Sequence, residues 1–183
     1  FSTMRNFTSK KGILNLKRRY MMLLGLMLLS ILSYSQSTIG GVINSYSPVT
    51  AVIGNTITYG NTVGAAHNLQ VGDYVLIAQM TGNTDGNAGN NDLRRVVAVN
   101  GNTVTVDGAS LTGKYDPGTE KVQLVYTPYD KTGFVVSSKI TPLPWDGSVG
   151  GIVSAITPGT INLGANIDAS CSGYRPTDTQ LLT

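Results

Sequence analysis

Short runs of Val, Ile and Thr, bounded by Gly and Asn, recur along residues 36–140. No stretch there shows the 3.6-residue apolar period of an amphipathic helix, so the runs predict β-strands joined by tight turns. Gly accepts positive φ at the first turn position, so Gly54-Asn55 predicts a type II′ hairpin and Asn100-Gly101-Asn102 predicts a second hairpin. The strands expected to flank these turns span 49–53, 56–59, 96–99 and 103–106.

A longer segment, 71–80, has Val75-Leu76-Ile77 at its centre. This continuous apolar run predicts a central strand that is buried on both faces. Two further runs, 122–126 and 134–137, bring the set to about seven short strands before residue 140. Strands at this density, without helices to cross between them, predict an all-β fold, with an antiparallel barrel or sandwich over residues 36–140.

The phrase Gly-Asn-Thr-(Ile/Val)-Thr occurs twice, at 54–58 and at 101–105. An internal duplication would produce this repeat, and so would the shared turn chemistry of two similar hairpins. Nothing else repeats in register along the sequence, which favours the hairpin explanation.

The composition changes after residue 140. Pro142 and Pro144 disfavour a central strand, so we expect an extended connector with Trp145 as a hydrophobic plug. Very short β-branched runs follow, and within residues 141–175 they predict the first rungs of a stacked, parallel β-solenoid. These runs span 151–156, 159–163 and 166–169. Residues 176–183 lack this rhythm and are predicted to be a disordered tail.

Residues 1–35 have the order of a secretory signal peptide. Lys17-Arg18-Arg19 precedes an uncharged apolar run at 20–32, and the small residues Ser33 and Ser35 place cleavage before Gln36. The run is shorter than the roughly 20 residues of a membrane-spanning helix. We therefore expect a secreted or cell-surface protein with no membrane span after cleavage.

The net charge of +3 originates in the same segment. All six basic residues before Gln36 lie there without any acidic residue, which leaves 7 Lys and Arg against 10 Asp and Glu in the rest of the chain. The basic isoelectric point is therefore no indication of nucleic-acid binding, and no nucleic-acid partner is expected.

The chain has one His, one Cys and one Trp, which excludes an intrachain disulfide and a Cys/His zinc site. His67 has no nucleophile motif beside it and is expected to be a surface loop residue. Glu120 is the single Glu, and most Asp residues adjoin Gly or Pro, where their side chains cap turn N–H groups. We therefore expect no catalytic residues and no enzyme activity. Cys171 is expected to pack as a small residue.

Residues 83–92 form the strongest candidate for a ligand site. Hard oxygen donors in a flexible loop suit Ca²⁺. The spacing is not that of an EF-hand and no bidentate Glu follows, so a solvated turn is favoured over a calcium site and no cofactor is required. The candidate ligands are Asp85, Asn87, Asn90 and Asp92.

Tyrosine side chains are the candidates for contact with a glycan. Exposed tyrosine rings stack on sugars, although Tyr is equally suited to a half-buried strand. Arg94 and Arg95 alternate along a strand and are expected on opposite faces, which argues against a joint anion patch. The tyrosines expected to be exposed are Tyr46, Tyr59, Tyr115, Tyr126 and Tyr129, of which Tyr59, Tyr115 and Tyr129 are the stacking candidates.

Five sequence phrases occur in an order that is more specific to one protein family than any single phrase is. They are 71–82, 99–106, 122–129, Trp145-Asp146-Gly147 with 150–153, and 159–175. Together they resemble an N-terminal module of large, adhesin-like surface proteins of gliding, type-IX-secreting bacteria. The resemblance covers about 39–175 and implies a β-rich, non-catalytic region followed by a Gly-rich or repeat-built body.

Two departures from that pattern matter. Tyr174-Arg175 continues into Pro176-Thr177 instead of Gly-Gly, and no C-terminal sorting domain follows. We therefore expect a fragment or a truncated product.

The sequence thus predicts a non-catalytic N-terminal β module of an exported cell-surface adhesin or extracellular matrix-type protein. Its expected partner is a surface glycan or another cell-surface protein. The alternative is an ancillary N-terminal domain of a secreted polysaccharide-active β-solenoid enzyme, and a third possibility is a structural cap that starts a solenoid.

Overall fold

The computed structural model describes residues 19–23, 35–82 and 87–173. Residues 19–23 form a short helical turn, and no described helix is long and apolar enough to span a membrane. Most of the predicted signal peptide and all of the predicted disordered tail lie outside the described residues. The described residues after Ser35 form one compact unit.

This unit is built from ten strands. They are β1 (Ser37–Gly41), β2 (Ser45–Ile53), β3 (Thr56–Tyr59), β4 (Val63–Gly64), β5 (Tyr74–Gln79), β6 (Asn91–Asn100), β7 (Thr103–Val106), β8 (Val122–Thr127), β9 (Gly133–Ile140) and β10 (Thr160–Leu163). The all-β fold class is confirmed.

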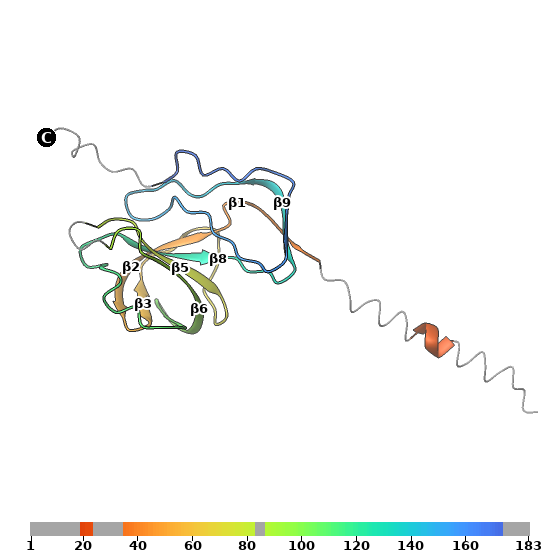
Figure 1. The fold of residues 1–183 in the computed structure, drawn as a ribbon, viewed down its shortest axis with the longest axis horizontal. Helices are drawn as coiled ribbons and strands as arrows, with labels where there is room; N and C mark the ends of the chain where they lie inside the picture. Colours follow the sequence, from red (N-terminus) through yellow and green to blue (C-terminus); the bar gives the residue numbers. More distant parts are fainter. Residues whose placement is uncertain (1–18, 24–34, 83–86, 174–183) are drawn as a thin grey trace, which may run out of the picture. The chain divides into compact units, whose positions relative to one another are not determined.

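Six of the strands close into an antiparallel barrel, in the order β2-β3-β7-β6-β5-β8 and back to β2, while β4 adds to the edge of β2 (Figure 1). Of the two antiparallel architectures expected from the sequence, the protein therefore adopts the barrel. Closure leaves none of these six strands with an open edge, because each has a hydrogen-bonded neighbour on both sides.

Both predicted hairpins are present. Gly54 has a φ of 61° and Gly101 a φ of 55° at the first positions of two-residue turns, and neither Asn55 nor Asn102 has positive φ. This combination is that of a type II′ turn, which matches the right-handed twist of the flanking strands. The central position predicted for 71–80 is also confirmed, because β5 lies between β6 and β8 and has Val75 and Ile77 fully buried.

The barrel consists of two similar halves, β2-β3-β5 and β6-β7-β8. Exchanging β2 with β6, β3 with β7 and β5 with β8 maps every neighbouring pair onto a neighbouring pair. An approximate two-fold axis passes between β3 and β7, where Ile57 pairs with Val104, the fourth residues of the two repeated phrases.

The irregularities of the backbone follow the same symmetry. β2 bulges between Val49 and Ala51, and β6 bulges between Val96 and Ala98, 47 residues further along in each case. Each bulge bends its strand where the strand changes partner, since β2 passes there from β8 to β3 and β6 passes from β5 to β7. The two halves therefore repeat in register beyond the shared phrase. This agreement favours an internal duplication over the explanation by hairpin chemistry alone.

The interior of the barrel is a single apolar cluster. Its buried members come from all six strands of the barrel and from the loop between β7 and β8, and β-branched residues predominate. They are Val49, Ile57, Val75, Ile77, Val96, Val104, Val106, Leu111, Tyr115, Val122 and Leu124.

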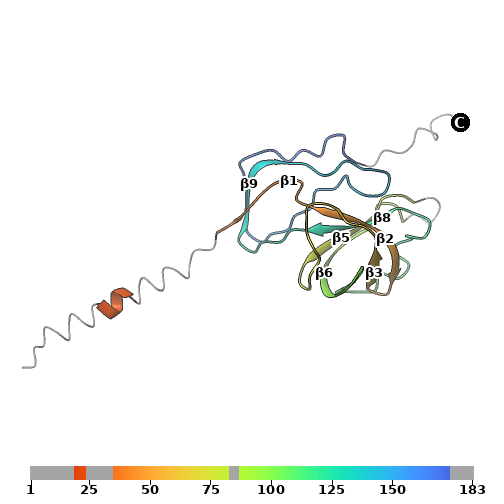
Figure 2. The ribbon, with the colours of Figure 1, turned by 180° about the vertical axis from the view of Figure 1, so that it is seen from behind.

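A second sheet is parallel and contains β1, β9 and β10 in that order. Figures 1 and 2 show β1 and β9 side by side, next to the barrel. The run at 134–137 was expected in the antiparallel domain, and this expectation was wrong, because β9 pairs in parallel on both sides. Periodicity along one strand carries no information about the direction of its neighbour, which is why the sequence did not show it.

The pairing between β9 and the chain that follows has a constant spacing. Gly133 pairs with Thr160, and isolated parallel bridges join Tyr129 to Ile156 and Ile140 to Ile167. Each partner lies 27 residues further along the chain.

The extended connector predicted at 141–147 is present, since this stretch contains no strand. It continues to about residue 154 and covers the outer face of β2 and β8. There Tyr46, Val125 and Val149 form a second apolar cluster. The buried side chains of the connector are Pro142 and Val149, the latter 4% exposed, whereas Trp145 is half-buried.

Glycine at position 133 is required by the β9–β10 pairing. Gly133 has a φ of 117°, and a Cβ there would overlap the carbonyl oxygen of Thr160. Gly147 has a similar φ of 99°, with open space where its Cβ would be. We expect Gly147→Ala to lower the free energy of unfolding by about 1–3 kcal/mol through backbone strain alone, and Gly133→Ala to lower it by more, because the two strands must also separate. Urea unfolding of both variants measures this, and equal losses would contradict the overlap.

Candidate functional site

A polar pocket of about 330 Å³ lies at one end of the barrel. Three segments form it: the end of β3 with the residues that follow, the loop before β5, and the turn between β6 and β7. The pocket is lined by Tyr59, Gly60, Asn61, Thr62, His67, Asn68, Leu69, Val99, Gly101 and Asn102.

His67 is held in this pocket from two sides. Its Nε2 lies 2.7 Å from Oδ2 of Asp73, and its ring stacks on Tyr126 with centroids 3.6 Å apart and planes 13° from parallel. A carboxylate only accepts hydrogen bonds, so Nε2 carries a proton. Asp73 is itself fixed by the backbone N–H of Gln70. His67 lies in a loop, as expected, and there it is half-buried and held in a fixed orientation.

Burial raises the pKa of the Tyr126 hydroxyl, and the negative charge of Asp73 raises that pKa further. Asp73 and Tyr126 thus together hold the imidazole of His67 in position at the wall of the pocket.

The structure places the three stacking candidates in three different settings. Tyr59 is half-buried and lines the polar pocket. Tyr129 follows β8 and is 47% exposed, with its ring 5.1 Å from that of Tyr74. Tyr115 is 7% exposed and belongs to the barrel core, so its expected exposure was wrong; Tyr46, at 0%, was wrongly expected to be exposed as well.

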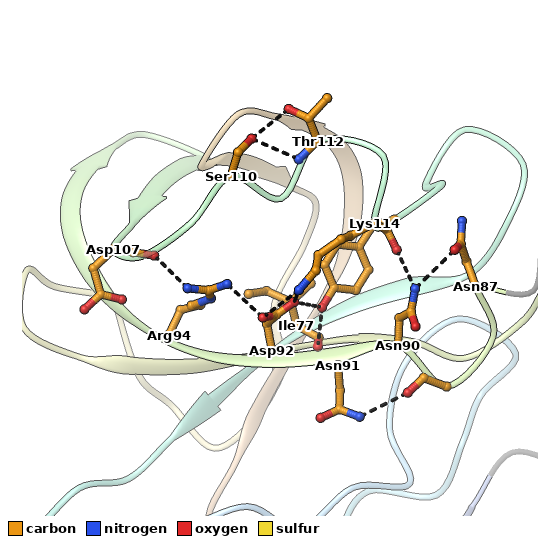
Figure 3. Close-up of polar contacts among 12 residues, drawn as sticks. Ile77, Asn87, Asn90, Asn91, Asp92, Arg94, Asp107, Ser110, Thr112 and Lys114 are labelled. Atoms are coloured by element: carbon orange, nitrogen blue, oxygen red, sulfur yellow. Dashed lines mark hydrogen bonds and ion pairs between the residues drawn. The ribbon is translucent and has the colours of Figure 1, made fainter.

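Asp92 lies on β6 inside a network of opposite charges (Figure 3). Its carboxylate contacts Nη2 of Arg94 at 2.8 Å and Nζ of Lys114 at 3.0 Å, and it accepts a hydrogen bond of 2.8 Å from the Tyr115 hydroxyl. The sequence offered Asp92 as a candidate calcium ligand while favouring a solvated turn, and here two cations and a hydroxyl occupy its oxygens.

The other described members of that candidate loop bond to protein groups. Asn90 donates to Oδ1 of Asn87 at 3.2 Å and to the carbonyl of Lys114 at 3.0 Å (Figure 3). Asp85 lies outside the described residues. Within the described ranges no group of three or more His, Cys, Asp or Glu side chains is placed to hold a metal ion.

The network also sets two pKa values. Burial would raise the pKa of Asp92, but the hydrogen bonds from Lys114 and Tyr115 and the charges of Arg94 and Lys114 together lower it below its ordinary value. Burial raises the pKa of Tyr115 strongly, and the adjacent Asp92 carboxylate raises it further.

Asp146 and Asp116 bond within their own turns, as predicted, whereas Asp107 and Glu120 bond to other segments. Asp146 accepts from the N–H groups of Ser148 and Val149, Asp107 accepts from that of Arg95, and Asp116 accepts from the Thr119 hydroxyl. Glu120 accepts from the Thr81 hydroxyl, which in turn receives the N–H of Lys121.

Arg94 and Arg95 do lie on opposite faces of β6. The Arg94 side chain is 15% exposed against Asp92, while Arg95 is exposed. Cys171 is also exposed, with a φ of 57°, so its expected burial among small residues was wrong.

A second hollow, of about 580 Å³, lies along β10 and the chain that follows it. Leu163, Ala165 and Ile167 form its apolar part, and the ion pair of Lys139 with Asp168, 2.7 Å long, is at its edge.

Sequence reasoning missed the amide side chains of the polar pocket. Asn61, Asn68 and Asn102 stand in three different turns, where Asn is expected for its backbone preferences alone. No local pattern distinguishes these three from the other turn asparagines, because only closure of the barrel brings them together.

The sequence matches no protein-family profile and no curated protein. Among solved structures it is similar to the tailspike protein gp49 from Pseudomonas phage LKA1, at 19% identity and a TM-score of 0.33. The similarity covers 60% of this chain and 19% of the tailspike chain.

Removing the charge of Asp92 should destabilise the barrel. We expect Asp92→Asn to lower the free energy of unfolding at neutral pH by about 1–3 kcal/mol, because Arg94 and Lys114 lose their shared counter-ion. Since the pKa of Asp92 is lowered by folding, its stabilisation is present above the unfolded value near 3.8 and is lost as the pH falls through the folded value.

The measurement is urea unfolding of both proteins at several pH values. The difference between wild type and Asp92→Asn should shrink below pH about 4. Asp116→Asn, which changes a turn residue outside this network, is the control. A difference between wild type and Asp92→Asn that does not depend on pH would contradict the role of the ionised carboxylate.

Proposed function

We propose that this chain is a non-catalytic N-terminal β module of an exported cell-surface adhesin or extracellular matrix-type protein, and that a β-solenoid body continues from its parallel sheet. The observation that carries the proposal is a row of exposed aliphatic side chains on β10 and the segment after it.

The paired positions on β9, the preceding strand, are buried. Phe134, Val136 and Ile140 on β9 are 2%, 0% and 1% exposed. Their parallel partners are Ile161, Leu163 and Ile167, which are 49%, 66% and 51% exposed. A β-solenoid stacks like residues in this manner, and each rung covers the one before it.

The exposure of β10 has a physical cost. Burying a Leu or Ile side chain contributes roughly 1.5–3 kcal/mol, and a sheet edge with unpaired backbone groups is prone to pair with other chains. A further parallel rung would cover the three aliphatic side chains and the hollow beside them, and would satisfy the edge of β10.

The lack of catalysis is supported by the way the titratable side chains are used. His67 is fixed by Asp73 and Tyr126, Asp92 is paired with two cations, and Glu120 accepts a hydrogen bond from the Thr81 hydroxyl. Export is supported by the basic, apolar and small-residue order of residues 17–35. The partner that we propose is a surface glycan or another cell-surface protein.

The open edge is equally compatible with a second candidate function, an ancillary N-terminal domain of a secreted polysaccharide-active β-solenoid enzyme. The two differ in what the following rungs carry. Clustered Asp side chains on those rungs would favour the enzyme.

The coding sequence beyond the codon for Thr183 tests the proposal directly. We expect the frame to continue and to place aliphatic residues 27 positions after Ile161, Leu163 and Ile167, because the spacing of the parallel pairs is constant. A stop codon, or charged residues at all three positions, would overturn the solenoid proposal.

Stability measurements test the same point in the protein. Leu163→Asn should change the free energy of unfolding of the present chain by less than about 0.5 kcal/mol, as at other surface sites. In the product of the extended frame it should cost about 2–5 kcal/mol, because the side chain would then be buried. Val136→Asn, already buried in β9, is the control and should be costly in both. A cost for Leu163→Asn that is the same in the short and long proteins would count against the further rung.

A further inference from the structure

We propose that the polar pocket binds a neutral pyranose, the terminal sugar of a surface glycan. This deepens the proposed function by assigning its glycan contact. It rests on that function only for the source of the sugar, since every residue of the pocket belongs to the barrel or its loops.

Two rings stand in the wall of the pocket. Tyr59 closes β3, and its hydroxyl is directed to the carbonyl of Gly101 at 3.4 Å. His67 is held by Tyr126 and Asp73 before any ligand arrives. Ring side chains that are fixed in advance lose little conformational entropy on binding, which favours affinity for a flat, partly apolar face such as that of a pyranose.

Three amide side chains complete the pocket. Asn61, Asn68 and Asn102 are exposed, and within the described part of the chain their amides make no hydrogen bond. An amide offers two donors and an acceptor, which matches pairs of neighbouring sugar hydroxyls. Among the described lining residues there is no Asp, Glu, Lys or Arg, and His67 is already paired with Asp73, which favours a neutral ligand. A volume of about 330 Å³ is at the lower end of ligand pockets and suits a single sugar ring.

The internal symmetry of the barrel provides a comparison. The two-fold axis relates Asn102 to Asn55, in the turn between β2 and β3. There Nδ2 of Asn55 donates to the carbonyl of Gly108 at 2.9 Å, and the N–H of Leu111 donates to the carbonyl of Gly54 at 3.1 Å. Leu111 is fully buried.

At the end of the barrel that carries the β2–β3 turn, the loop after β7 therefore fills the site. At the opposite end, the loop after β3 leaves the equivalent site open. The fold accepts a filled site at one end of the barrel, so the backbone does not require the pocket at the other end. The open pocket, with its unbonded amides, is the departure from symmetry that a ligand site explains.

The test is titration of the isotope-labelled chain with neutral monosaccharides, followed by NMR. Glucose, galactose, mannose and N-acetylglucosamine at millimolar concentration are the probes, and glucuronate is the charged comparison. We expect at least one neutral sugar to shift the amide resonances of Asn61, Asn68 and Asn102, and Asn102→Ala to weaken its binding about tenfold. Asn68→Ala is the second variant, since its side chain is exposed and supports no other contact in the described residues.

Asn55→Ala is the matched control. It changes the equivalent turn position at the filled end of the barrel and should leave sugar binding unaltered, even though it removes a hydrogen bond that the fold uses. Shifts confined to Tyr74 and Tyr129, a preference for glucuronate, or no shift with any sugar would overturn the proposal. None of these results depends on whether a further rung follows β10, so the pocket and the solenoid can fail independently.

Discussion

Two buried amides fasten the connector to the barrel. Gln123 points out of the barrel from β8, and it both donates to and accepts from the backbone of Gly150, at 3.0 and 2.9 Å. Asn44 does the same for Ser154 and also donates to the carbonyl of Tyr126. Because β8 has the barrel core on one face and the connector on the other, these polar groups are buried and must be paired. The course of the chain from the barrel to β10 depends on them.

The two halves of the barrel share one pairing pattern and differ in the loops that follow β3 and β7. The turns, bulges and pairings agree in both halves, since they determine closure and leave little freedom. The loops after β3 and β7 are free of that constraint. One of them packs Leu111 and Tyr115 against the core, and the other frames the pocket around His67.

Local chemistry made much of the fold predictable. Gly54 and Gly101 fixed two hairpins, and the apolar centre of β5 indicated a central strand. Partner direction was not predictable, because a run such as 134–137 reads alike in parallel and antiparallel sheets. The candidate site was even harder to predict from the sequence. Tyr59 was found, but Tyr115 was misplaced, since an aromatic residue after a turn suits the surface and the core equally. The proximity of His67 to Asp73 and Tyr126 arises from tertiary packing.

The barrel is inserted between two neighbouring strands of the parallel sheet. Ser37 on β1 pairs with Phe134 on β9, 97 residues later, whereas β9 reaches β10 in 27. Closing so long a loop is entropically unfavourable in an unfolded chain. Once β2 pairs with β8, through Tyr46 and Val125, the two ends of the barrel lie side by side and the long loop becomes effectively short. We therefore expect β1 to gain its partner only after β2 and β8 have paired, so that formation of the parallel sheet depends on the barrel.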